Sequence, residues 1–126
     1  MKTKFSSSWI RSKQSRKQRK YRHNAPLHIK QKFVGAHLSK ELREKYKKRS
    51  INLRKGDSVK VTRWQFRDKT GKIDEVDVKK TQVYVGGIEI VKRDGTKARY
   101  PLNPSNLIVT EVDVNDKMRN KIFERK

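Results

Sequence analysis

Cysteine is absent from this chain of 126 residues, which excludes disulfide bonds and thiolate metal sites. Long apolar runs are absent too. The longest, residues 83–91, contains a glutamate and two glycines and has the length of a strand, so it cannot cross a bilayer. Apolar residues make up only 32% of the chain against 38% for charged ones, too little for a core that uses the whole chain.

Negative charge is scarce, above all at the N-terminal end. The first carboxylate is that of Glu41, and the chain has 35 Lys plus Arg against 13 Asp plus Glu, a formal net charge of +22. Residues 1–50 hold 17 of the basic residues and 2 of the acidic ones. Because like charges repel in a compact state, a fold gains no stability from this excess. We therefore expect a polyanionic partner, and a nucleic-acid backbone is the simplest one.

Signals for catalysis, metals and membranes are also missing. The sequence has no Ser-His-Asp arrangement, no Walker loop and no zinc-binding spacing. Every residue between Ile10 and Tyr21 is polar, whereas a transit peptide or a membrane-surface helix needs an amphipathic apolar face. We expect no enzymatic activity, no cofactor, no metal, no small-molecule substrate and no membrane partner. The acidic residues within 74–77 are flanked by lysines, so we expect them to form salt bridges.

Charge and pattern divide the chain into three segments. Residues 1–50 form a basic arm, which we expect to be disordered without RNA except for a helix near 39–49 with Ser39 as its N-cap. Residues 11–22 contain good helix formers and could be helical when bound. Residues 51–112 contain short β-branched stretches, five of which predict strands of a small barrel, so the predicted fold is mainly β. Residues 113–126 are predicted to form a helical tail in which Met118, Ile122 and Phe123 share one face.

Turn signals fix the connections between these strands. Asp94-Gly95 predicts a tight turn between Val91 and Tyr100. Residues 83–91 are predicted to be one strand with a bulge or bend at Gly86-Gly87.

One stretch carries a recognisable motif. Residues 59–73 (VKVTRWQFRDKTGKI) resemble a KOW motif, in which a basic loop and a required glycine, here Gly71, connect two strands. We expect Gly71 to adopt a positive φ, which side-chain-bearing residues avoid. For the loop aromatics Trp64 and Phe66 the sequence leaves two interpretations open, packing within the protein or stacking on unpaired bases.

Four further stretches of the sequence extend the resemblance. Residues 38–46 resemble the helix that precedes the KOW barrel in one ribosomal family, and residues 100–107 (YPLNPSNL) resemble its Pro-x-x-Pro-Ser stretch. Residues 12–20 and 24–30 resemble its basic arm. The family is that of the large-subunit ribosomal protein numbered twenty-four in the universal scheme and twenty-six in eukaryotes, and this sequence is similar to archaeal members. Trp64 and Asp68 stand where the family usually has glycines, so we expect the loop to follow a different backbone path.

The resemblance implies a fold and a role. It implies an SH3-like barrel over residues 51–112 and direct binding to large-subunit ribosomal RNA near its 5′ region. It also implies an early role in subunit assembly and a place in the cytoplasmic ribosome around the polypeptide exit tunnel, next to other ribosomal proteins. A KOW-type transcription elongation factor remains the alternative.

Charge and resemblance together identify candidate RNA-binding residues. In the arm they are Arg11, Lys13, Arg16, Lys17, Arg19, Lys20, Arg22, His23, Lys30, Lys32, Lys40, Arg43, Lys47 and Arg49. In and after the loop they are Arg63, Trp64, Arg67, Lys69 and Lys72. Gly71 and Gly95 are assigned to structural turns. We expect that deletion of residues 1–37 removes most RNA affinity and leaves the barrel folded.

Overall fold

The computed structural model describes residues 5–125, so residues 1–4 of the predicted arm and Lys126 of the predicted tail lie outside the described residues. The elements follow one another as α1 (Ser15–Asn24), α2 (Leu27–Phe33), β1 (Gly35–Leu38), α3 (Lys40–Tyr46), β2 (Ser50–Asn52), β3 (Ser58–Val61), β4 (Thr70–Asp77), β5 (Gln82–Val85), β6 (Glu89–Val91), β7 (Lys97–Arg99), the 3-10 turn η1 (Pro104–Asn106), β8 (Leu107–Glu111) and α4 (Lys117–Glu124).

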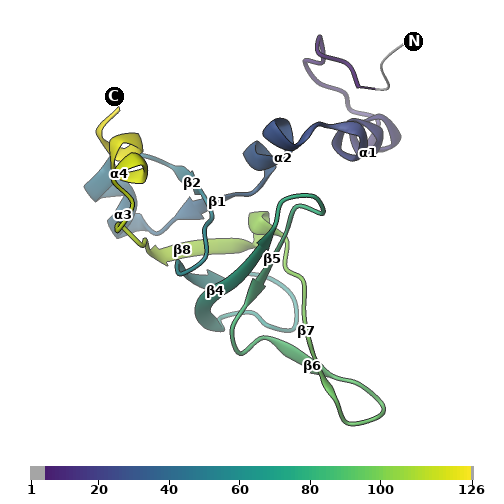
Figure 1. Cartoon of the computed structure of the whole chain (residues 1–126), viewed down its shortest axis with the longest axis vertical. Coiled ribbons are helices and arrows are strands. Elements are labelled where there is room, and N and C mark those ends of the chain that lie inside the picture. The colour runs from purple at the N-terminus through teal and green to yellow at the C-terminus, as the bar shows by residue number, and fades with distance from the viewer. Residues whose placement is uncertain (1–4, 126) are drawn as a thin grey trace.

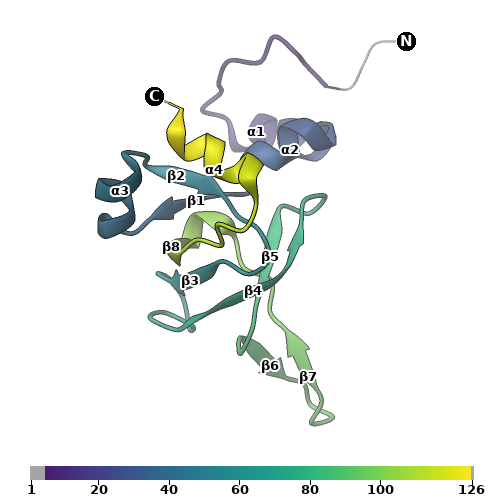
Figure 2. The ribbon, with the colours of Figure 1, turned by 60° about the vertical axis from the view of Figure 1, so that its left-hand side comes forward.

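Six strands form one sheet in the order β2-β1-β8-β3-β4-β5. Strands β1 and β8 are parallel, and the other neighbouring pairs are antiparallel. Strands β6 and β7 form a separate ribbon, which projects from the end of the molecule opposite to α1 (Figures 1 and 2). The fold is therefore mainly β with helices in the N-terminal segment and at the C-terminus, as predicted.

The predicted SH3-like barrel is not confirmed, because the sheet is open. Its outer strands β2 and β5 do not pair with each other within residues 5–125. Curvature brings β5 against the segment before β8, where Val83 and Leu102 exchange two backbone hydrogen bonds of 2.9 and 2.8 Å. On the other side β1 pairs with β8, so the sheet continues into strands that the sequence did not predict.

Strands β1 and β2 come from the segment around the predicted arm–barrel junction. Val34, Ala36 and Leu38 are at most 2% exposed and belong to the hydrophobic core. Deletion of residues 1–37 would remove most of β1, an inner strand of the sheet, so with this structure we no longer expect the barrel to survive the deletion. The sequence did not predict these strands because they are short, with four and three residues, and are separated by a charged helix. An alternation of apolar and polar residues cannot be recognised over so few positions.

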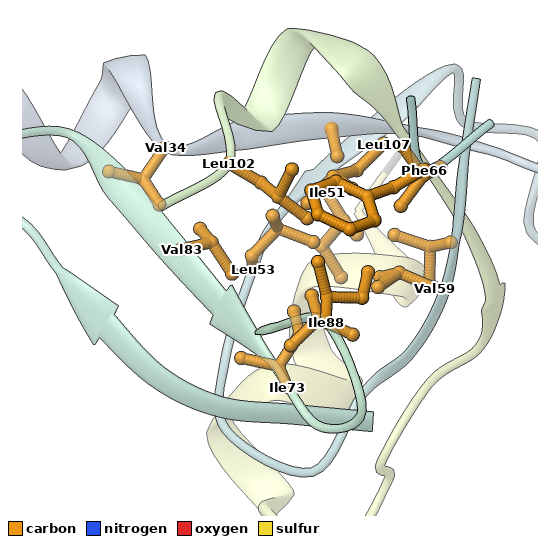
Figure 3. Close-up of a cluster of buried hydrophobic side chains, with 14 of the residues drawn as sticks. Val34, Ile51, Leu53, Val59, Phe66, Ile73, Val83, Ile88, Leu102 and Leu107 are labelled. Carbon is orange, nitrogen blue, oxygen red and sulfur yellow. The ribbon is translucent and has the colours of Figure 1, made fainter. Parts of the chain in front are cut away.

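The core is small and is built from alternating strand residues. In β3, Val59 and Val61 point inward while the residues between and before them are half-exposed, and in β8 Leu107 and Val109 do the same. Figure 3 shows Val59 and Leu107 converging with Val83 of β5 and with loop residues such as Leu53 and Ile88. Burial of each such side chain contributes about 1.5–3 kcal/mol, and this cluster stabilises the sheet.

Gly71 is required for close approach and not for an unusual backbone conformation. Its φ is not positive, in contrast to Gly56, Gly87 and Gly95, so that part of the prediction is wrong. A Cβ atom on Gly71 would lie 2.6 Å from the carbonyl oxygen of Gly86 and 2.8 Å from Cγ1 of Val85. Only a residue without a side chain lets β4 approach the end of β5 in this way.

The structure contains both other predicted turns, at Asp94-Gly95 and at Gly86-Gly87. Gly95 has φ +82° in the predicted turn, where the carboxylate of Asp94 accepts hydrogen bonds from the backbone N–H and the hydroxyl of Thr96. The predicted bend at Gly86-Gly87 is present, but it separates β5 from β6, so residues 83–91 are two strands in different sheets and not one.

Helix α3 confirms its predicted start and ends earlier than predicted. The hydroxyl of Ser39 accepts a hydrogen bond from the N–H of Leu42, as an N-cap does. Lys47 has a left-handed backbone with φ +52°, which ends the helix before Arg49. Leu38 lies in β1, whereas the apolar residues Leu42 and Tyr46 belong to the helix.

Helix α4 docks through charge as well as apolar contact. Its N-cap is Asp116. Met118 and Ile122 lie one turn apart in the helix and are 64% and 39% exposed, so the side that they share is not buried against the sheet. Phe123 instead stacks on Tyr46 with ring centroids 4.0 Å apart. One turn earlier Arg119, 2% exposed, faces the body of the protein.

Arg119 forms a bidentate ion pair with Asp57, which is fully buried. Its Nη1 and Nη2 atoms each donate to one carboxylate oxygen at 2.6 Å. The same guanidinium donates to the carbonyl oxygens of Asp113 and Asn52, and Asp57 accepts from the N–H groups of Arg54 and Asp113. Nearly all polar atoms of the pair are satisfied, which a buried charge requires. The pair therefore fixes α4 to the loop before β3.

Replacing Arg119 should destabilise the protein strongly. Arg119→Met leaves the carboxylate of Asp57 buried without its partner, and the free energy of unfolding in urea should fall by about 3–5 kcal/mol. Arg54→Met is the matched control, since it breaks the exposed Arg54–Asp116 pair and should cost about 0–1 kcal/mol. A loss for Arg119→Met as small as that of the control would contradict the assigned role of the ion pair.

Candidate nucleic-acid interface

Helix α1 carries the densest basic surface of the arm. With about 3.6 residues per turn, Arg16, Arg19 and His23 lie on the side of the helix away from Tyr21, and Lys20 lies at the edge of that side. All four basic side chains are exposed. Glutamate and aspartate are absent from the helix, so its face has one sign of charge.

Aromatic contacts hold this helix in place. The ring of Trp9 stacks on that of Tyr21 with centroids 4.7 Å apart, and Phe33 of α2 meets Tyr21 edge-on at 6.2 Å. The guanidinium of Arg22 lies over the ring of Phe33 at 5.4 Å. The arm is therefore helical and ordered in this structure, because side chains spread along the sequence form a small cluster of their own. Packing, and not base stacking, accounts for Tyr21.

Six cations on and before α1 have no hydrogen-bond or ion-pair partner in the part of the chain that the structure describes. The side chains of Arg11, Lys13, Arg16, Lys17, Arg19 and Lys20 make no hydrogen bond or ion pair within residues 5–125. They are all exposed. Nothing in the described part of the fold uses these charges, which leaves them free for an external anion.

The remaining arm candidates are divided between solvent and structure. Lys32, Lys40, Lys47 and Arg49 are exposed around α2 and α3. Lys30 and Arg43 have structural contacts: Lys30 donates to the carbonyl oxygen of Lys79 at 3.2 Å, and Nε of Arg43 donates to that of Leu38 at 2.8 Å. The contact of Lys30 joins segments 49 residues apart, which the sequence alone does not bring together, whereas that of Arg43 spans only 5 residues.

The loop between β3 and β4 is a second basic surface, and it is fixed. The N–H of Asp68 donates to the carbonyl oxygen of Val61, and Thr62 donates through both its N–H and its hydroxyl to that of Asn106, each at 2.9 Å. Phe66, 7% exposed, packs on Tyr100 with ring centroids 5.1 Å apart. Arg63, Arg67, Lys69 and, at the start of β4, Lys72 are exposed.

Trp64 and Phe66 have opposite environments. Phe66 belongs to the core, whereas Trp64 is 76% exposed. Trp64 and Asp68 have φ +69° and φ +66°, which is a conformation that glycine adopts most easily. The expectation that residues other than glycine divert the loop backbone is therefore not supported at these two positions, because both adopt a glycine-like φ.

Asp68 offsets part of the loop's positive charge. Its carboxylate lies 2.9 Å from Nζ of Lys60 and 3.6 Å from Nε of Arg67. The hydrogen bond and charge of Lys60, with a smaller contribution from Arg67, hold the pKa of Asp68 below its ordinary value of 3.8. The group is therefore ionised throughout the neutral range, and any stability it contributes is lost only as the pH falls through this lowered pKa.

The structure adds basic residues that the sequence analysis missed. Lys92, Arg93 and Lys97 are exposed at the tip of the β6–β7 ribbon. The sequence contained a signal for them, because these basic residues flank the predicted Asp94-Gly95 turn and the tip of a turn is exposed. Among the acidic residues within 74–77, Glu75 forms a salt bridge, as predicted. Its partner is Arg99 at 2.9 Å and not one of the flanking lysines.

Other kinds of site are not formed by the described part of the chain. No group of three or more histidine or acidic residues within residues 5–125 could hold a metal ion. In the same range no helix has the length and apolar character needed to cross a membrane.

Removing the carboxylate of Asp68 should strengthen RNA binding. Asp68→Asn releases Lys60 and Arg67 for phosphates, and asparagine tolerates the left-handed backbone at this position. Affinity for large-subunit ribosomal RNA, measured at fixed salt, should rise about 2- to 5-fold, in line with an exposed ion pair. Asp116→Asn is the matched control, because it removes another exposed, paired carboxylate at the N-cap of α4. Equal effects of both variants would contradict a role for the loop.

Comparison with known proteins identifies the family. A family model that describes the ribosomal proteins L26 of eukaryotes and their archaeal L24 counterparts matches residues 12–126. A large ribosomal subunit protein uL24 from Methanothrix thermoacetophila is 48% identical over 114 residues, covering 90% of this chain and 98% of that protein. Another uL24, from Methanosphaera stadtmanae, is 45% identical over 115 residues, covering 91% and 98%. The chain therefore belongs to the ribosomal protein family uL24, which comprises eukaryotic L26 and archaeal L24, and it resembles the archaeal members.

Proposed function

We propose that this protein is a structural constituent of the large subunit of the cytoplasmic ribosome and that it binds large-subunit ribosomal RNA directly. The observation that carries this proposal is the set of unpartnered cations on and before α1. A ribosomal protein with a net charge of +22 meets a phosphate backbone in its assembly, and that backbone supplies the missing negative charge. The role is structural, since catalytic motifs are absent from the sequence.

Three segments of the chain have different roles in the proposed RNA binding. Residues 1–50 supply an RNA-binding arm, in which the cations before and on α1 neutralise phosphates. Within residues 51–112 the loop between β3 and β4 presents Arg63, Arg67 and Lys69 from a rigid sheet. Residues 113–126 form a tail whose helix is held by the Arg119–Asp57 pair. Two rigid basic surfaces on one chain allow it to hold two parts of a folded RNA together.

The location within the subunit follows from the family resemblance alone. It gives binding near the 5′ region of the large-subunit RNA, an early part in assembly and a place around the polypeptide exit tunnel beside other ribosomal proteins. The alternative of a KOW-type transcription elongation factor is disfavoured by the family to which the chain belongs.

Neutralising two cations of α1 should weaken RNA binding and its dependence on salt. In the variant Arg16→Gln, Arg19→Gln both charges are lost while helix propensity is kept. If both contact phosphates, the slope of log affinity against log salt becomes shallower by roughly 1.4–1.8. The measurement is a binding titration with deproteinised large-subunit RNA over a series of salt concentrations.

A double variant of α4 is the control. Lys117→Gln with Lys121→Gln removes the same charge from exposed helical positions, and Figure 1 shows α4 on the opposite side of the molecule from α1. This variant should keep the salt slope of the wild type. If both double variants change the slope equally, binding depends on net charge alone and α1 is not the interface.

A further inference from the structure

Trp64 combines two features that a stable fold avoids. Its side chain is 76% exposed, although burial of an indole is favourable, and its φ of +69° places its Cβ in a sterically disfavoured conformation. The other non-glycine residues with positive φ in residues 5–125 are Lys47, Asp68 and Thr81. Trp64 is the large aromatic residue among them. Backbone strain of this kind is typical of functional positions.

The surrounding loop holds Trp64 in a defined position. Its carbonyl oxygen accepts a hydrogen bond from the N–H of Arg67 at 3.0 Å, and two residues along the chain Phe66 is buried against Tyr100. The strands β3 and β4 lie on both sides of the loop within the six-stranded sheet. The indole is therefore presented by a fixed backbone, which lowers the entropy lost on binding.

The charges of the same loop indicate the class of ligand. Arg63, Arg67 and Lys69 are exposed within five residues of Trp64 along the chain. Cations next to an aromatic face fit a nucleotide, whose base stacks on the ring while its phosphates meet the cations. A base inside a duplex is already stacked on both faces, so a base that is unpaired fits this surface best.

We propose that Trp64 is a stacking platform for an unpaired base in an RNA loop or bulge, with Arg63, Arg67 and Lys69 holding the flanking phosphates. This inference rests on the proposed function and specifies its ligand. It also explains why a tryptophan occupies a glycine-like backbone position: contact with RNA, and not folding, favours the side chain.

Fluorescence tests the contact directly. Trp9→Phe keeps an aromatic ring on Tyr21 and leaves Trp64 as the one tryptophan, because the chain has two. A short single-stranded RNA should quench Trp64 more strongly than a duplex of the same length at equal saturation. Equal quenching by both, or none by either when both bind, would overturn the proposal.

Trp64→Gly separates binding from stability. Glycine suits the positive φ, so the melting temperature should be unchanged or higher. Affinity for the single-stranded RNA should fall about 5- to 150-fold, the range expected for loss of one stacked base, while affinity for the duplex is kept. Trp64→Phe retains a ring and should lose less. A lower melting temperature of Trp64→Gly, or an unchanged affinity for the single strand, would assign Trp64 to another role.

The Arg16→Gln, Arg19→Gln variant distinguishes this inference from the proposed function. Suppose that this variant makes the slope of log affinity against log salt shallower for large-subunit RNA, while Trp64→Gly leaves the affinity for the single-stranded RNA unchanged. The proposal of RNA binding is then supported and the proposal of base stacking is contradicted. If the wild-type protein binds neither large-subunit RNA nor the oligonucleotides, both proposals fall.

Discussion

Repulsion between like charges is the constraint on which this structure depends. A chain with a net charge of +22 must keep its cations apart and still bury enough apolar surface to fold. It does so by concentrating apolar side chains in one six-stranded sheet and by placing α1, with its uniform charge, away from that sheet (Figure 1). Segments outside the sheet are then held by few but specific contacts: the aromatic cluster around Tyr21, the stack of Tyr46 on Phe123, and the Arg119–Asp57 pair.

These contacts explain how a chain with so little apolar material becomes ordered beyond its core. An aromatic ring buries a large area for one residue, and a satisfied buried ion pair specifies one docking geometry. Apart from Arg119 and Arg22, the basic residues take no part in these contacts. Exceptions such as Lys30 and Arg43, which bind backbone carbonyl oxygens, show that the fold uses cations only where an acceptor is near.

Local patterns allowed much of the fold to be predicted from the sequence. The Ser39 N-cap, the Asp94-Gly95 turn and the alternation around Val59 depend on neighbours in the chain, and all three are present. The failures concern contacts between distant segments. Strands β1 and β2, the close approach at Gly71 and the partner of Arg119 are set by pairing across many residues, and no local pattern encodes them. For the proposed interface, charge indicated which segments are candidates for RNA binding, but only the structure separated exposed Trp64 from buried Phe66.

The salt dependence of binding by the unmodified protein tests the central claim most directly. If the arm and the loop between β3 and β4 together neutralise about ten phosphates of large-subunit RNA, log affinity should fall with log salt with a slope on the order of −7 to −9. A slope near −2 would mean that most of these cations never meet a phosphate, and it would contradict the account.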